Sequence, residues 1–204
     1  MKHLLKKLDY YRNFPRFQLE RHFDVILSEY ITKIINHYEG TNFTFLFPEF
    51  PVRKSLLTNI FLSEMESVAF DYAIFDTQNK QVGIVELKTD TESNNAKQDS
   101  YLEKIKSSVT CNDLIQFINK RVTYRTYKRI DSKFEFLRNE MIENNCNFKS
   151  HTTVRTYKIS PSNDKIPSNS YFSFEQIAND VKIKDEFWTE LCVYLNKWDI
   201  GLGC

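Results

Sequence analysis

Two short strand-like segments joined by a polar turn constrain the fold of this chain more than any other feature. They cover residues 68–75 (Val-Ala-Phe-Asp-Tyr-Ala-Ile-Phe) and 81–88 (Gln-Val-Gly-Ile-Val-Glu-Leu-Lys), and both are rich in β-branched and aromatic residues. A turn over residues 77–80 centres the hairpin, so the numbers of opposed residues sum to 157. This register predicts that Asp71 lies directly opposite Glu86.

Opposed residues of an antiparallel pair have Cβ atoms about 5 Å apart on one face. Lys88 follows Glu86 by two residues and therefore shares that face. Two carboxylates at this distance repel each other unless a divalent cation separates them or one is protonated. Mg²⁺ takes oxygen ligands such as carboxylates, water and substrate phosphate, and a nearby ammonium group stabilises charge on the phosphate. Asp71, Glu86 and Lys88 therefore indicate metal-assisted hydrolysis of a phosphodiester.

A surface hairpin with a cross-strand salt bridge is the alternative interpretation of these three residues. Val85 and Leu87 fill one face of their strand, while Val82 and Ile84 continue the face that carries Glu86. Neither face has the pattern of a solvent-exposed surface, which favours an interior strand.

The spacing of these residues resembles a known nuclease signature. Asp71, fourteen intervening residues and then Glu86-Leu87-Lys88 resemble the PD-(D/E)xK motif, with Phe70 where the motif has proline. The resemblance implies a phosphodiesterase dependent on Mg²⁺ or Mn²⁺. It implies that Asp71 and Glu86 hold the metal, that the backbone carbonyl of Leu87 is a further ligand, and that Lys88 is catalytic.

The order of expected elements extends this resemblance over residues 18–160. Periodicity and turn signals predict a helix over 18–38, strands over 43–47, 68–75 and 81–88, a helix over 96–107 and a strand over 152–159. Further helical stretches begin near residues 110 and 132. This is the αβββαβ order of the restriction-endonuclease-like and Holliday-junction-resolvase-like core, with a helical insertion. The resemblance implies an α/β fold with a mixed central sheet flanked by helices.

The remaining residues are expected to complete a single domain over 1–204 with a C-terminal helical extension at about 170–204. Residues 173–176 (Ser-Phe-Glu-Gln) have the form of a capping box, and an amphipathic helix is expected over 185–198. That last helix packs either on the core or on a second copy, so a homodimer is one alternative.

Three further residues are candidates for the site. Glu20 falls on the apolar stripe of the first helix, and residues 16–20 resemble the first helix of archaeal Holliday-junction resolvases, which implies a metal-binding role. The alternative is favourable placement of Glu20 near a helix N-terminus. The resemblance also implies that Gln98 and Tyr101, one helical turn apart, bind substrate. A solvated Gln98 beside a core Tyr101 is the other reading, and we favour function for Gln98 and the core for Tyr101.

Charge and composition bear on three other possibilities: binding of nucleic acid, a zinc site, and a membrane or secreted protein. The net charge of +1 neither supports nor excludes nucleic acid, but basic residues cluster with tyrosines over 120–129, as on a phosphate-binding surface or a solvated helix face. The four cysteines form no CxxC pair, which argues against a zinc site. No apolar run is long enough to span a bilayer, and the N-terminus lacks the apolar region of a signal peptide.

We therefore expect a cytoplasmic, Mg²⁺- or Mn²⁺-dependent deoxyribonuclease that acts on DNA. A catalytically silent module with the same fold, binding nucleic acid or protein, is the alternative.

Overall fold

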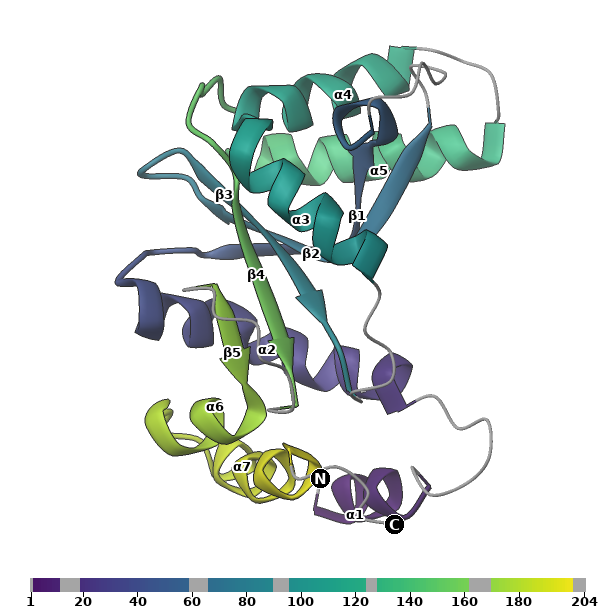
Figure 1. Cartoon of the computed structure of the whole chain (residues 1–204). Coiled ribbons are helices and arrows are strands. Elements are labelled where there is room, and N and C mark those ends of the chain that lie inside the picture. The colour runs from purple at the N-terminus through teal and green to yellow at the C-terminus, as the bar shows by residue number, and fades with distance from the viewer. Residues whose placement is uncertain are drawn as a thin grey trace. The chain divides into compact units, whose positions relative to one another are not determined.

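The computed structural model describes residues 2–11, 19–58, 66–89, 96–123, 128–161 and 170–199 (Figure 1), with the backbone alone for residues 2, 19–21 and 128–131. It is an α/β structure with a five-stranded mixed sheet in the order β1-β2-β3-β4-β5, flanked by helices. The strands are Phe45–Arg53 (β1), Ser67–Asp76 (β2), Gln81–Leu87 (β3), Arg155–Ser160 (β4) and Tyr171–Ser173 (β5). The pairs β1–β2 and β2–β3 are antiparallel, whereas β4–β5 is parallel.

The chain divides into two compact units, which we call the hairpin unit and the terminal unit. The hairpin unit comprises Thr41–Glu86 and Asn95–Tyr157, and the terminal unit comprises Met1–Gly40, Leu87–Asn94 and Lys158–Cys204. Helices of the hairpin unit are η1 (Lys54–Leu56), α3 (Ala96–Ser108), α4 (Cys111–Thr123) and α5 (Lys128–Glu143). Helices of the terminal unit are α1 (Lys2–Tyr11), α2 (Leu19–Glu39), α6 (Phe174–Asp180) and α7 (Glu186–Asp199).

The turn between β2 and β3 is held by the buried side chain of Asp76. Its Oδ1 accepts hydrogen bonds from the backbone N–H groups of Gln78 (3.0 Å) and Asn79 (2.9 Å), and its Oδ2 accepts one from Asn79 Nδ2 (2.7 Å). An aspartate that binds the backbone of the following residues stabilises a tight turn. The observed pairs run from Asp76–Gln81 to Tyr72–Val85, so paired residue numbers sum to 157 and the predicted register is confirmed.

One face of the β2–β3 hairpin packs against helices in the core of the hairpin unit. The pairs Ala73–Ile84 and Phe75–Val82 place four apolar side chains on this face. They share a buried apolar cluster with residues of α3, α4 and α5, and Figure 1 shows α4 and α5 side by side. We call this side of the sheet the helix-covered face.

Three helix boundaries agree with signals in the sequence. Gly40 follows α2 with a φ of +61° and donates its N–H to Asn36, as a glycine does after a helix C-terminus. Ser173 and Gln176 form a reciprocal capping box at α6. Before α4, Thr110 Oγ1 accepts a hydrogen bond from the Asp113 N–H (3.2 Å).

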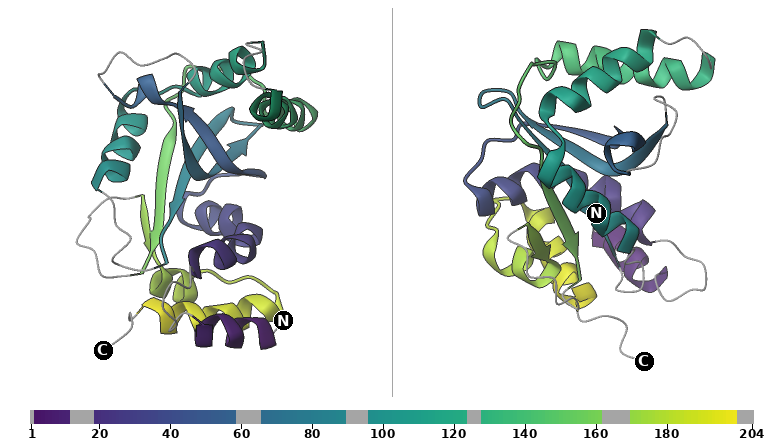
Figure 2. Two further views of the ribbon diagram at one scale, coloured as in Figure 1. Left: turned by 90° about the vertical axis from the view of Figure 1, so that its right-hand side faces the viewer. Right: turned by 45° about the horizontal axis from the view of Figure 1, so that its top comes forward.

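The terminal unit contains a helix, α1, that was not predicted from the sequence. Figure 2 shows α1 beside α7, where Asp9 Oδ1 accepts a hydrogen bond from Trp198 Nε1 (3.0 Å) and Asp9 Oδ2 pairs with Lys197. The Trp198 ring meets Phe23 of α2 edge-on, with centroids 5.0 Å apart. Within the described part of the chain, no helix has the length and apolarity needed to cross a membrane.

Strand β1 also differs from the expectation, because it continues to Arg53 through Pro48 and Pro51 instead of ending at residue 47. Proline nitrogen cannot donate a hydrogen bond, and a strand at the edge of a sheet tolerates this loss. Glu49 has a φ of +50°, and it separates the buried Phe47 from the buried Phe50, which are three residues apart instead of two. β1 is paired with β2 on both sides of this irregularity.

Candidate active site

Asp71 and Glu86 lie in the hairpin unit, at the end of the paired region of β2 and β3. Continuing the observed register by one step beyond Tyr72–Val85 sets Asp71 opposite Glu86. By strand alternation both side chains belong to the helix-covered face, two residues from Ala73 and Ile84 respectively. Asp71 is half-buried, whereas Glu86 is 1% exposed. The sequence thus located two acidic groups correctly on neighbouring strands.

Burial makes the charged form of this pair of carboxylates energetically unfavourable. A carboxylate removed from water needs a proton, polar partners or a cation, and two neighbouring carboxylates add mutual repulsion. Two hard oxygen donors fit Mg²⁺ or Mn²⁺, which bind proteins through one or two carboxylates and keep several positions for other oxygen ligands. The described side chains include no group of three or more His, Cys, Asp and Glu residues that could hold a metal ion. The hairpin unit thus sets two carboxylates opposite each other on neighbouring strands.

Leu87 and Lys88 follow Glu86 directly and belong to the terminal unit. The Lys88 backbone N–H donates a hydrogen bond to the carbonyl of Ile159 (2.8 Å), which ties this segment to β4. The Lys88 side chain is 5% exposed. The Leu87 side chain is fully buried, while its backbone carbonyl is the atom expected to bind metal.

The other candidate residues have different environments. Glu20 lies in the first turn of α2, and its side chain is outside the described part of the structure. Gln98 is half-buried on α3. Tyr101, one turn later, is buried in the apolar cluster of the hairpin unit, with Lys97 Nζ 5.9 Å from its ring centroid. Tyr101 therefore has the core position that we favoured for it over substrate binding.

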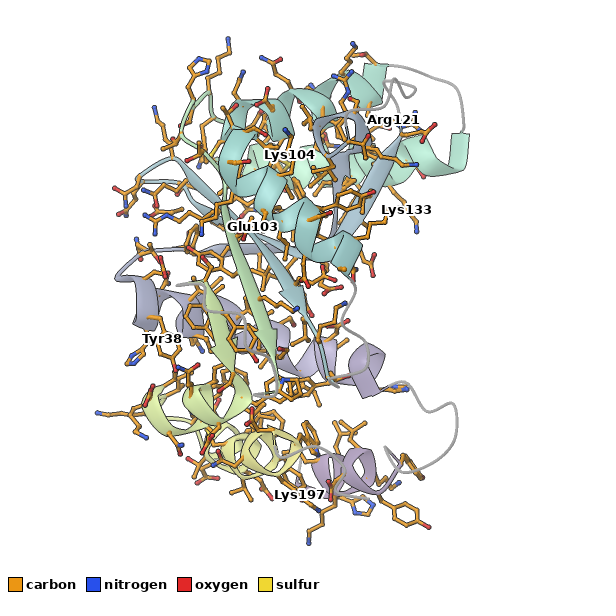
Figure 3. The ribbon with its side chains drawn as sticks, in the orientation of Figure 1. Tyr38, Glu103, Lys104, Arg121, Lys133 and Lys197 are labelled. Atoms are coloured by element: carbon orange, nitrogen blue, oxygen red, sulfur yellow. The ribbon has the colours of Figure 1, made fainter. Side chains whose placement is uncertain are left out.

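The basic run over residues 120–129 is only partly a surface feature. Arg121, which is labelled in Figure 3, is buried. Its guanidinium carbon lies 5.4 Å from the ring centroid of Phe134. This cation–π contact joins α4 to α5 and assigns Arg121 a packing role. Lys120 is exposed, while residues 124–127 are outside the described part of the chain.

Strand β4 carries a buried lysine, Lys158, that was not singled out from the sequence. Lys158 is 6% exposed, pairs with Tyr171 of β5 and donates its backbone N–H to the carbonyl of Ser170 (2.9 Å). In the sequence, Lys158 alternates with the apolar residues Tyr157 and Ile159, a pattern that is typical of a solvent-facing lysine on a half-buried strand. The burial of its side chain becomes evident only in the folded structure.

Comparison of the chain with models of protein families, with curated proteins and with solved structures finds no match.

Proposed function

We propose that this protein is a metal-dependent nuclease that hydrolyses phosphodiester bonds of DNA. The observation that carries the proposal is the β2–β3 register, which aligns Asp71 with the buried Glu86 on neighbouring strands. Lys88, two residues beyond Glu86, completes the residue set of the PD-(D/E)xK signature.

The order of elements supports a restriction-endonuclease-like fold for this nuclease. The helix α2, the strands β1, β2 and β3, the helix α3 and the strand β4 follow one another in the αβββαβ order. The helices α4 and α5 form an insertion before β4, and α6 and α7 follow the core. The mixed sheet flanked by helices agrees with this architecture.

In the proposed site, Asp71 and Glu86 hold Mg²⁺ or Mn²⁺ together with the backbone carbonyl of Leu87, and Glu20 is a further candidate ligand. When bound, such an ion supplies a Lewis acid for the phosphate and lowers the pKa of bound water. Lys88 donates hydrogen bonds to the attacking water or to the phosphate oxygens, where it stabilises negative charge that builds up during the reaction. Gln98 of α3 is a candidate contact to the substrate.

A cleavage assay tests this proposal. Purified protein is incubated with Mn²⁺ and with supercoiled, linear, single-stranded and branched DNA, and products are resolved on gels. We expect cleavage of at least one substrate, and a loss of about 100-fold or more in Glu86→Ala and Lys88→Ala. Glu143→Ala, which removes an exposed carboxylate at the end of α5, is the matched control and should retain full activity.

Inactivity of the wild-type protein on every substrate would contradict the proposal. If DNA binding persisted in that case, the catalytically silent binding module would become the better assignment.

A further inference from the structure

Helix α1 of the terminal unit has one side that packs into the unit and one side that faces solvent. Leu5 and Leu8, which lie three residues apart on one helix face, are both buried. Asp9 accepts a hydrogen bond from Trp198 Nε1 of α7 and pairs with Lys197. The apolar side of α1 and its one acidic residue are therefore both engaged within the terminal unit.

The outward side of α1 carries cationic and aromatic side chains. Lys6 and Lys7 are exposed, and each precedes an exposed tyrosine by four residues, the spacing of neighbours on a helix surface. These tyrosines are Tyr10, which is 62% exposed, and Tyr11, which is 41% exposed, and their ring centroids lie 5.7 Å apart. We call the surface formed by Lys6, Lys7, Tyr10 and Tyr11 the α1 strip.

The sequence concentrates positive charge in this short segment. Residues 2–11 contain three lysines and one acidic residue, whereas the whole chain of 204 residues has a net charge of +1. The acidic residue, Asp9, pairs with a further lysine on α7. The segment therefore has an excess of positive charge that an anionic partner would complement.

Exposed lysines beside exposed tyrosines fit a nucleic-acid strand with unpaired bases. Lysines contact the phosphates of such a strand, and aromatic rings stack on bases that are not held in a duplex. An anionic membrane also attracts basic helices, but a helix that binds a membrane buries its apolar face in the lipid. In α1 that face consists of Leu5 and Leu8, which are already buried in the protein. The single strand is therefore the better match.

We propose that the α1 strip binds single-stranded DNA, with its two lysines on phosphates and its two tyrosine rings stacked on bases. This inference rests on the proposed nuclease function for the choice of DNA as the nucleic acid. It narrows the substrate class of that function to DNA with unpaired bases, such as single strands or branched molecules with unpaired ends.

Fluorescence anisotropy with a fluorescein-labelled single-stranded oligonucleotide in EDTA tests the proposal without cleavage. We expect Lys6→Gln combined with Lys7→Gln to weaken binding about ten-fold. The magnitude of the slope of log K against log salt concentration should fall by about 1.4, because each phosphate contact to a single strand contributes about 0.7. Lys6→Arg combined with Lys7→Arg keeps both charges and should bind like the wild type.

The tyrosines are tested separately. Tyr10→Ala should weaken binding of the single strand about five-fold or more, because one stacked base loses its aromatic platform. The same variant should leave the affinity for a blunt duplex of the same sequence unchanged, since paired bases do not stack on the ring. Tyr10→Phe keeps the ring and should bind the single strand like the wild type.

Lys182→Gln combined with Lys184→Gln is the matched control for the loss of two charges. Both lysines are exposed in the same unit and precede α7, whereas α1 contacts α7 at Trp198, near its other end. A helix of 14 residues is about 20 Å long, so these lysines are remote from the α1 strip. The control should keep wild-type affinity and slope, and circular dichroism verifies that each variant is folded.

Wild-type affinity and salt slope in the Lys6→Gln, Lys7→Gln variant would overturn the proposal, and so would an equal loss in the control. Binding of the wild type to vesicles of phosphatidylcholine and phosphatidylserine, but not to DNA, would overturn it in favour of a membrane surface. Because the lysine and tyrosine variants change separate exposed residues, either set decides the proposal if the other fails to fold.

The cleavage assay separates this inference from the nuclease function. A protein that binds single strands through the α1 strip but cleaves no DNA refutes the nuclease function alone. A protein that cleaves DNA and binds it equally well without the lysines and tyrosines of the α1 strip refutes this inference alone.

Discussion

Gly83 of β3 and the ring of Tyr157 on β4 are packed so closely that a Cβ added to the glycine would lie 2.7 Å from Tyr157 Cε2. The same Cβ would lie 2.9 Å from Cγ1 of Ile74, the residue opposite Gly83 on β2. The Tyr157 ring is itself buried and meets Phe43 edge-on, with ring centroids 6.2 Å apart. The absence of a side chain at position 83 therefore allows this aromatic residue to pack on the sheet.

The first prediction is that Gly83→Ala destabilises the protein. The added methyl group has to displace a rigid buried ring, and overpacking of this kind costs about 1–3 kcal/mol. Urea unfolding followed by circular dichroism measures the change.

Gly40→Ala is the control for this prediction, because it adds the same methyl group without a clash. No atom lies within 4 Å of a Cβ at position 40, so the cost is limited to the backbone strain of roughly 1 kcal/mol that a φ of +61° imposes on alanine. A Gly83→Ala protein as stable as the wild type would show that the β3–β4 packing is looser than described.

The second prediction concerns the two opposed carboxylates. A ligand that binds only the folded state raises its stability, by about 2.7 kcal/mol at a free concentration a hundred times its dissociation constant. Mn²⁺ should therefore raise the melting temperature of the wild-type protein, and a chelator should reverse the increase. Differential scanning fluorimetry of Glu86→Ala should show no increase.

Glu143→Ala should respond to Mn²⁺ like the wild type, because it removes an exposed carboxylate of α5. An equal shift in Glu86→Ala would place the bound ion elsewhere on the protein.

The third prediction concerns alkaline pH. Burial raises the pKa of the Cys146 thiol from 9.0 to about 12. Because the pKa of this thiol is higher in the folded state, the folded protein keeps its full free energy of unfolding below pH 9, where the thiol is protonated in both the folded and the unfolded state. Above pH 9 the free energy of unfolding falls progressively, because the unfolded chain releases the proton first. The slope is at most about 1.4 kcal/mol per pH unit for one group.

Urea unfolding of Cys146→Ala between about pH 8 and pH 10 should show a shallower decrease in stability than the wild type. Ile105→Val, a core variant without a titrating group, should lower stability by a similar amount at each pH. Parallel curves for Cys146→Ala and the wild type would contradict the prediction.

The fourth prediction concerns Tyr30 and Asp185 in the terminal unit. Tyr30 Oη donates a hydrogen bond to Asp185 Oδ2 (2.7 Å), and the Phe187 N–H donates to Oδ1 (2.8 Å). The first of these bonds is the larger cause of a pKa of Asp185 below its usual 3.8. Tyr30→Phe should therefore raise this pKa toward 3.8, as measured by carboxyl NMR titration.

Because the folded-state pKa of Asp185 is depressed, its contribution to stability is present above about pH 4 and is lost as pH falls through the folded value. Tyr30→Phe should make the protein less sensitive to acid over this range. Tyr38→Phe is the control: Tyr38 pairs with Asp180, so the pKa of Asp185 should not change. A normal Asp185 pKa in the wild type would contradict the prediction.

The sequence predicted the β2–β3 hairpin and its register because the information is local. Two strands of β-forming residues flank a symmetric polar turn, and Asp76 fixes that turn through its own neighbours. The helices α2, α3, α4 and α7 were predicted for a similar reason, since their apolar spacing reflects the face that each one buries. The carboxylate pair followed from the register.

Features that depend on distant parts of the chain were not predicted. Helix α1 fully buries only Leu5 and Leu8 among its described residues and is held by contacts of Asp9 with α7, far away in the sequence. The burial of Lys158 depends on tertiary packing around β4, which its own sequence neighbours do not encode. A strand of three residues such as β5 is too short to show alternation.

Strand β1 has a consequence for the behaviour of the protein in concentrated solution. An exposed strand edge can recruit a strand from another molecule and start an ordered aggregate. The described outer strand contains Pro48 and Pro51, which have no amide hydrogen to offer to an incoming chain, and Glu49 adds a charge and a local distortion. These three residues interrupt the template for such growth, so their replacement by ordinary strand-forming residues would favour fibril formation.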